Sequence, residues 1–89
     1  MNCKFEFIYS HDGWFIRLVI GRLDCNRDSS IAHKLNIPLE EYRNILKVFG
    51  ANASPDDIYN DMYFQHHEDA QNCKDYLIDR FLVMLRLTH

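Results

Sequence analysis

Hydrophobic and polar residues alternate in two stretches near the N-terminus, residues 3–9 and 14–20. A period of two residues is typical of strands with one buried face. Between the stretches lies Asp12-Gly13, a pair suited to the two-residue turn of a β-hairpin, because such turns need positive φ angles. A turn at this pair gives the following partners across the hairpin: Tyr9 with Ile16, Phe7 with Leu18, and Phe5 with Ile20. The sequence therefore predicts an antiparallel hairpin with apolar residues facing one another.

Two short helices are predicted after a polar connection over residues 21–27. The first helix follows three N-cap candidates and has three apolar positions: Asp28, Ser29 and Ser30, then Ile31, Ala32 and Leu35. Asn36 tolerates the left-handed conformation and ends this helix. Pro38 suits the first turn of the second helix, which runs to Phe49 and stops at Gly50.

The next segment is a predicted loop over residues 51–57, followed by an ambiguous stretch over residues 58–65. Ser54-Pro55-Asp56-Asp57 is a plausible helix start, whereas the stretch has four residues that favour a strand: Ile58, Tyr59, Tyr63 and Phe64. We favour a third strand over Asp61–Gln65 that joins the hairpin.

The last segment, Glu68 to Leu87, has the spacing of an amphipathic helix. Its predicted inward stripe consists of Ala70, Cys73, Leu77, Phe81, Met84 and Leu85. Residues 81–85 are apolar all round, which favours cover on more than one side. That cover is either a second copy or partner, or the hairpin and helical pair of the same chain. The elements together predict one α+β domain over residues 1–89, in the order ββααβα.

Composition narrows the functional classes. The chain has 89 residues, 13% of them aromatic, which is enough for one small core. No apolar run approaches the roughly 20 residues of a membrane-spanning helix, so we expect a soluble, cytoplasmic protein without a membrane partner.

The net charge is −3, and residues 51–89 carry three basic and seven acidic side chains. Nucleic-acid binders usually have a basic excess. The acidic half either keeps the protein soluble or presents carboxylates to a basic partner.

Metal and catalytic chemistry find little support in the sequence. Three cysteines without a secretory signal indicate reduced thiols. Five side chains could ligate zinc, namely Cys25, His33, His66, His67 and Cys73, but no CxxC or HxxxH pair is present. No nucleophile with a base and an orienting group can be assembled. We therefore expect no metal, no cofactor and no enzymatic activity.

Residues 30–46 resemble a helix-turn-helix. Ala32 stands where the helices cross, Asn36 takes the usual glycine position, and Tyr42 is at a core position. In a DNA complex the second helix would enter the major groove, and Glu40 and Glu41 would oppose binding to phosphates. The candidate DNA-binding residues are Arg27, Lys34, Arg43, Asn44 and Lys47. We favour the alternative, a helical pair packed on a sheet.

The chain also has a wider resemblance, which rests on the general character and the order of three segments: "FEFIYSHDGWFIRLVIG", "IAHKLNIPLEEYRNILKVFGA" and "YFQHHEDAQNCKDYL". With these segments in this order, the chain resembles the short accessory proteins of phages and mobile elements of Gram-positive bacteria, among them anti-CRISPR inhibitors of Cas9-type nucleases. The resemblance implies a non-enzymatic inhibitor that binds its target stoichiometrically, often on a basic surface meant for nucleic acid.

The acidic half supplies a candidate surface for such binding. Its residues are Asp56, Asp57, Tyr59, Asp61, Tyr63, Glu68, Asp69, Asp75 and Asp79. Asp75 and Asp79 are four residues apart and are expected on one exposed helix face. Carboxylates speed association with a basic partner, and tyrosines supply buried contact. We thus expect a nuclease inhibitor, with a small helix-turn-helix regulator, dimeric through its last helix, as the alternative.

Overall fold

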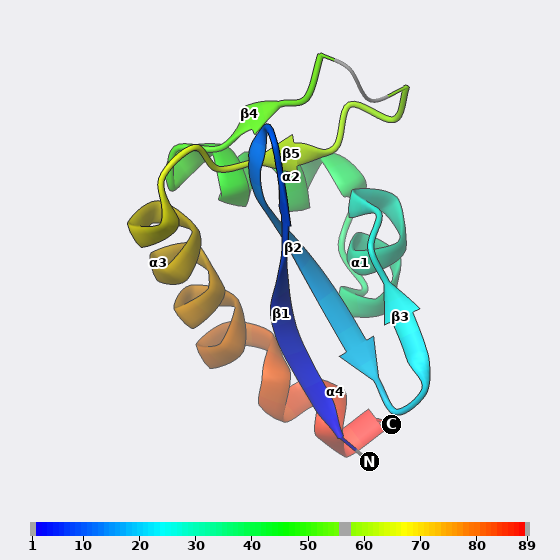
Figure 1. The fold of residues 1–89 in the computed structure, drawn as a ribbon. Coiled ribbons are helices and arrows are strands. Elements are labelled where there is room, and N and C mark those ends of the chain that lie inside the picture. Colours follow the sequence, from blue (N-terminus) through cyan, green and yellow to red (C-terminus); the bar gives the residue numbers. More distant parts are fainter. Residues whose placement is uncertain (1, 56–57, 89) are drawn as a thin grey trace.

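The computed structural model describes residues 2–55 and 58–88 and confirms the α+β class. Its main sheet is antiparallel and has the order β1 (Cys3–Ser10), β2 (Gly13–Ile20), β3 (Leu23–Cys25). Figure 1 shows the β1–β2 hairpin crossing in front of the helices, with α3 on one side and α1 on the other. The helices therefore cover one face of the hairpin.

The hairpin forms as predicted, but its register and turn differ from the prediction. The pairs are Tyr9 with Trp14, Phe7 with Ile16, and Phe5 with Leu18, and His11 and Asp12 form the loop. Gly13 belongs to β2 and has a φ of 141°; a Cβ on it would lie 2.2 Å from the Phe64 carbonyl oxygen. This glycine thus serves a close approach and not the turn. A shift of two residues keeps every side chain on its predicted face.

The connection over residues 21–27 contains β3, although the sequence predicted no strand there. Leu23 pairs with Ile20, and Cys25 pairs with Leu18. With three residues, β3 is too short for any alternation of polar and apolar side chains to show. Its existence depends on the tight turn after β2, where Gly21 has a φ of 59°.

The two helices form where the sequence predicts them, but the predicted N-cap of the first helix was wrong. α1 (Asp28–Leu35) ends at Asn36, which adopts the left-handed conformation with a φ of 59°. α2 (Leu39–Val48) begins directly after Pro38, which precedes the helix and does not lie in its first turn. Asp28 lies in α1, and Arg27 occupies the N-cap position without a side-chain cap. The carboxylate of Asp28 does not cap this helix, because it accepts a hydrogen bond from the backbone N–H of Met62.

The predicted strand over residues 61–65 is only partly correct. β5 (Met62–Tyr63) is shorter and pairs with β4 (Asn52–Ala53), inside the segment predicted as a loop. Phe64, directly after β5, pairs with the hairpin by exchanging two backbone hydrogen bonds of 2.9 Å with Trp14. This bridge and the side-chain contacts of Ser54 with Asp12 and of Tyr63 with Phe15 connect the β4–β5 pair to the tip of the hairpin.

The last helix runs from His67 almost to the C-terminus, with a change of pitch in its middle. It consists of α3 (His67–Leu77), a π-helical turn η1 (Ile78–Leu82) and α4 (Val83–Thr88). A π turn adds a residue to the repeat and rotates the following side chains. Leu82 is buried in consequence, whereas Met84, predicted to face inward, is exposed. The other stripe residues are buried as predicted.

One hydrophobic core lies between the inner face of the hairpin and the helices. Its largest fully buried side chains include Tyr42, Phe64, Leu18 and Ile31. Among the described residues, no helix is long and apolar enough to cross a membrane.

The Tyr42 hydroxyl is a polar atom inside this core, and it has no hydrogen-bond partner among the described residues. Burial raises the pKa of Tyr42 well above its usual value, and nearby Asp28 adds to the effect. We expect Tyr42→Phe to leave the free energy of unfolding unchanged or to raise it by up to about 1 kcal/mol. Urea titration followed by circular dichroism measures this. Tyr42→Ala, which leaves a cavity, should lower it by about 3 kcal/mol or more. A clear loss in Tyr42→Phe would contradict the unpaired hydroxyl.

Candidate partner-binding surface

Two buried carboxylates fix the segment that leads into β5. Asp28 begins α1, and its backbone N–H donates a hydrogen bond of 3.2 Å to Asp61 Oδ1. Asp28 Oδ2 in turn accepts a bond of 2.9 Å from the backbone N–H of Met62. Both side chains are buried. A backbone N–H donor thus takes the place of water at each carboxylate. A buried charge needs such a hydrogen-bond partner.

Two arginines from the helical pair complete this arrangement. Arg27 Nη1 lies 3.0 Å from Asp61 Oδ2. Arg43 Nη1 donates a bond of 2.8 Å to the carbonyl oxygen of Asn60 and lies 3.9 Å from Asp28 Oδ2. We refer to Arg27, Asp28, Arg43 and Asp61 as the Asp28–Asp61 network. Through this network, residues 60–62 contact the start of α1 and the side chain of Arg43 on α2.

The residues just before this anchored point are apolar and exposed. Ile58 is 87% exposed and Tyr59 is 56% exposed. The guanidinium carbon of Arg27 lies 4.2 Å from the centre of the Tyr59 ring. This distance is within the range of a cation–π contact. The network therefore holds a loop whose apolar side chains point into solvent.

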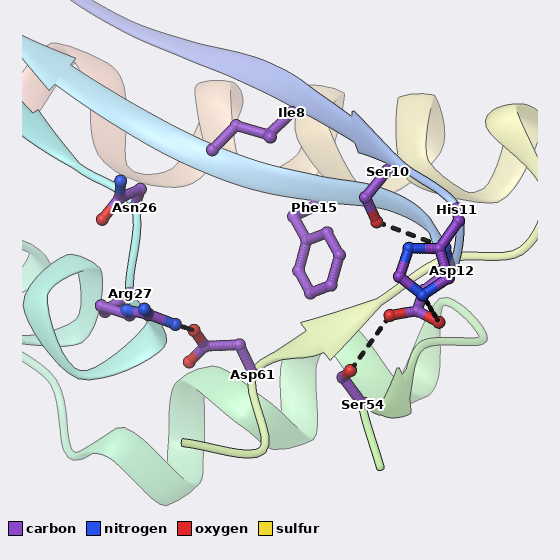
Figure 2. Close-up of a pocket in the computed structure, with 9 residues that line it drawn as sticks. All are labelled: Ile8, Ser10, His11, Asp12, Phe15, Asn26, Arg27, Ser54 and Asp61. Atoms are coloured by element: carbon purple, nitrogen blue, oxygen red, sulfur yellow. Dashed lines mark hydrogen bonds and ion pairs between the residues drawn. The ribbon is translucent and has the colours of Figure 1, made fainter. Parts of the chain in front are cut away.

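A pocket of about 340 Å³ lies between the outer face of the hairpin and a wall that includes Arg27, Ser54 and Asp61. Figure 2 shows Phe15 between the Arg27–Asp61 pair and the contact of Asp12 with Ser54. The ring of Tyr63 lies 6.0 Å from that of Phe15. The full lining is Ile8, Ser10, His11, Asp12, Phe15, Asn26, Arg27, Ser54 and Asp61.

The outer face of the hairpin changes character along its length. Away from the pocket it is ionic, with Lys4 Nζ at 2.8 Å from Glu6 Oε1 and Arg17 bonded to both Glu6 and Asp24. Hydrogen bonds from Lys4 and Arg17 lower the pKa of Glu6 to about 2. Toward the pocket the same face carries Ile8 and Phe15. We define the aromatic patch as Ile8, Phe15, Ile58, Tyr59 and Tyr63.

The polar side chains of the pocket do not form a nucleophilic site. Ser54 Oγ donates a bond of 3.3 Å to Asp12 Oδ2, and His11 Nε2 lies 3.4 Å from Asp12 Oδ1. The carboxylate therefore stands between the hydroxyl and the imidazole. An activated serine needs the imidazole at its own hydroxyl, with the carboxylate behind it. These contacts instead attach the hairpin loop to the start of the β4–β5 connection.

The predicted partner-binding residues do not gather on one surface. Tyr59 and Tyr63 belong to the aromatic patch, whereas Glu68, Asp75 and Asp79 are exposed along α3 and η1. Asp69 is half-buried, with its carboxylate beside Gly50. Asp56 and Asp57 lie outside the described residues.

Placing Asp61 on an exposed acidic surface was wrong. Only 4% of this residue is exposed, because its carboxylate is engaged with Arg27 and with the backbone of Asp28. In the sequence, Asp61 stands among six other acidic residues, and nothing local distinguishes it from the exposed ones. The partners that bury it are 33 and 34 residues away in the chain.

The candidate DNA-binding residues are likewise divided by the structure. Asn44 and Lys47 are exposed on α2, and Lys34 is half-buried on α1. Arg27 and Arg43 contact the chain's own β4–β5 connection through Asp61 and Asn60. The two arginines that could contact a phosphate or a base therefore already bind groups of the same chain, which weakens the DNA-binding interpretation.

Sequence reasoning missed Ile8, Phe15 and Ile58 as members of the aromatic patch, and it missed Arg27 as the neighbour of Tyr59. One signal was available, because Ile8 and Phe15 stand at positions of the alternation where a solvated strand face is normally polar. The exposure of Ile58 and Tyr59 depends on how the chain leads into the β4–β5 pairing, which four residues of strand do not reveal.

The thiols and the histidines offer no alternative site within the described ranges. Cys3, Cys25 and Cys73 are buried and unpaired. Burial raises the pKa of Cys73 to about 12 and also raises the pKa of Cys25, so neither is activated. Over residues 2–55 and 58–88, no three His, Cys, Asp or Glu side chains are placed to hold a metal ion.

No protein family, curated protein or solved structure matches the chain.

Proposed function

We propose that this protein acts by stoichiometric binding to another protein, and that the aromatic patch is the binding surface. One observation carries the proposal: the buried carboxylates of the Asp28–Asp61 network fix residues 60–62, and the two residues just before them, Ile58 and Tyr59, are exposed. Burying charges is costly and contributes little net stability. Fixing the loop lowers the entropy lost on binding, which improves affinity.

The composition of the aromatic patch supports the same function. Tyrosine and arginine are enriched at the centres of interfaces, where they contribute most of the binding energy. Tyr59 and Tyr63 stand on either side of the anchored segment, and Arg27 already lies over Tyr59. The adjacent pocket gives a partner side chain a cavity with an apolar wall at Ile8 and Phe15. Ile8 and Phe15 belong to both the pocket and the aromatic patch.

The partner that we propose is a nuclease of the Cas9 type, as the resemblance of the chain implies. Such a target offers basic surfaces that read and hold DNA. The pocket rim contributes Asp12, and the exposed acids Glu68, Asp75 and Asp79 add negative charge on α3 and η1. Opposite charges of this kind speed association, while the aromatic patch supplies the contact area.

The test is co-elution of the full chain with a Cas9-type nuclease, together with a DNA-cleavage assay. We expect a complex and loss of cleavage for the wild-type protein. The double variant Ile58→Asp/Tyr59→Ala should weaken the complex by about 30-fold or more, as the loss of an interface hot spot does. Tyr9→Ala is the matched control, because it removes an exposed tyrosine from the other face of the hairpin.

Two outcomes would contradict the proposal in different ways. Unimpaired cleavage without co-elution would exclude the nuclease as the partner. A double variant that binds as tightly as the wild type would exclude the aromatic patch as the surface. A gel shift on DNA that is lost in Arg43→Ala would instead support the helix-turn-helix alternative.

A further inference from the structure

A second cavity, distant from the aromatic patch, lies beside α2. It has a volume of about 470 Å³ and is lined by Pro38, Glu40, Glu41, Asn44, Ile45, Val48 and Arg80. Val48 is 83% exposed although it is apolar. Arg80 Nη2, from the π turn, lies 3.8 Å from Glu41 Oε1 and forms the opposite wall. This α2 groove therefore joins α2 to the last helix.

The last helix has an exposed stripe that begins in the π turn, which also carries Arg80. Val83 is 67% exposed and Leu87 is 83% exposed, one helical turn apart on α4. Arg86 accompanies them, and Asp79 precedes them on the π turn; both are exposed. The stripe thus has an acid at its start, two apolar residues, and a base near its end.

The exposed face of α2 has the same order of charges, from acid to base along the chain. Glu40 stands near its start and Lys47 near its end, with Asn44 and Val48 on the same side. Seven residues separate Glu40 from Lys47, and seven also separate Asp79 from Arg86. Seven residues of helix span about 10 Å. The two charge pairs therefore coincide when the two helices run antiparallel.

We propose that two copies of this chain form a dimer in which α2 of each copy packs antiparallel on the η1–α4 stripe of the other. Glu40 then faces Arg86 of the second copy, Lys47 faces Asp79, and Val83 lies between these two charge pairs, next to Asn44. The Arg80–Glu41 contact joins the groove to the π turn, where the stripe begins, within one copy. Both halves can thus be used at once, which is the self-complementary arrangement of a two-fold dimer.

The charge order supplies a direct test by sedimentation equilibrium over about 1 µM to about 1 mM, the range in which modest dimers dissociate. We expect the wild type to dimerise, and Glu40→Lys and Arg86→Glu each to raise the dimer dissociation constant by about tenfold or more. An equimolar mixture of these two variants should dimerise again, because each copy then meets a complementary charge in the other. Glu68→Lys is the matched control and should leave dimerisation unchanged.

Val83→Asp tests the apolar part of the contact independently of the charges, and it should abolish the dimer. A wild-type protein that stays monomeric at about 1 mM would overturn the proposal. So would a dimer that is insensitive to Val83→Asp, or a mixture of Glu40→Lys and Arg86→Glu that fails to dimerise. Each of these results leaves nuclease binding by the aromatic patch unaffected, because none of these variants changes a residue of that patch.

Discussion

Gly13→Ala is expected to lower the free energy of unfolding by about 3 kcal/mol or more. The added Cβ would lie 2.2 Å from the Phe64 carbonyl oxygen, and a φ of 141° is unfavourable for any residue with a Cβ. Backbone atoms cannot rotate away as a flexible side chain would. The hairpin and the β4–β5 segment must therefore separate at the Trp14–Phe64 bridge. Small domains are stable by only about 5–15 kcal/mol, so this loss is a large fraction of the total.

Urea titration of Gly13→Ala, followed by tryptophan fluorescence and circular dichroism, measures the loss. Trp14 reports on the separation itself, because it is the residue bridged to Phe64. Gly21→Asn is the matched control: Gly21 has a φ of 59°, a value that Asn36 adopts in this protein. The control should stay within about 1 kcal/mol of the wild type. An equally small effect for Gly13→Ala would contradict the close approach.

The hairpin shows what local pattern can and cannot predict. The alternation assigned both strands and their buried faces correctly, because burial of one face is a property of each strand. The register required knowing why Gly13 is a glycine, and Asp12-Gly13 has a standard explanation as a turn. The actual reason is the backbone of Phe64, which is 51 residues further along the chain.

Short strands were the other limit of prediction. β3, β4 and β5 have three, two and two residues, which is below the length at which alternation becomes visible. The helices were predicted well, since Asn36, Pro38 and Gly50 mark their ends through local conformation. The π turn within the last helix was not predicted, and it accounts for the exchange of Met84 for Leu82 in the core.

The candidate surface was the least predictable part, because it depends on pairing between distant charges. The tyrosines of the acidic half were identified from the sequence, whereas their anchoring by Asp28 and Asp61 was not. Nothing in the local sequence distinguishes Asp61 from Glu68, yet one is buried and the other exposed. Only the approach of the α1 N-terminus to β5 separates them.

Asp28→Ala is expected to lower the free energy of unfolding by about 3 kcal/mol, because removal of one partner leaves the others buried without compensation. The backbone N–H of Met62 loses its acceptor, and Arg43 loses a carboxylate at 3.9 Å. Asp61→Ala should have an effect of similar size, since it removes the acceptor of the Asp28 N–H and the partner of Arg27. Urea titration measures both, and Glu68→Ala, an exposed acid, should cost less than about 1 kcal/mol.

The double variant Asp28→Ala/Asp61→Ala decides whether the two carboxylates act as one unit. Residues in one network show coupling of about 0.5–3 kcal/mol, so the double variant should lose less than the sum of the single losses. The same variants should weaken partner binding while they remain folded, because the loop that carries Tyr59 then loses its anchor at residues 60–62. Additive losses, or binding unchanged in the folded single variants, would show that the Asp28–Asp61 network stabilises the fold without organising the surface. The network has a functional role only if stability and binding fall together, because the charges that hold residues 60–62 are the same charges that fix Ile58 and Tyr59.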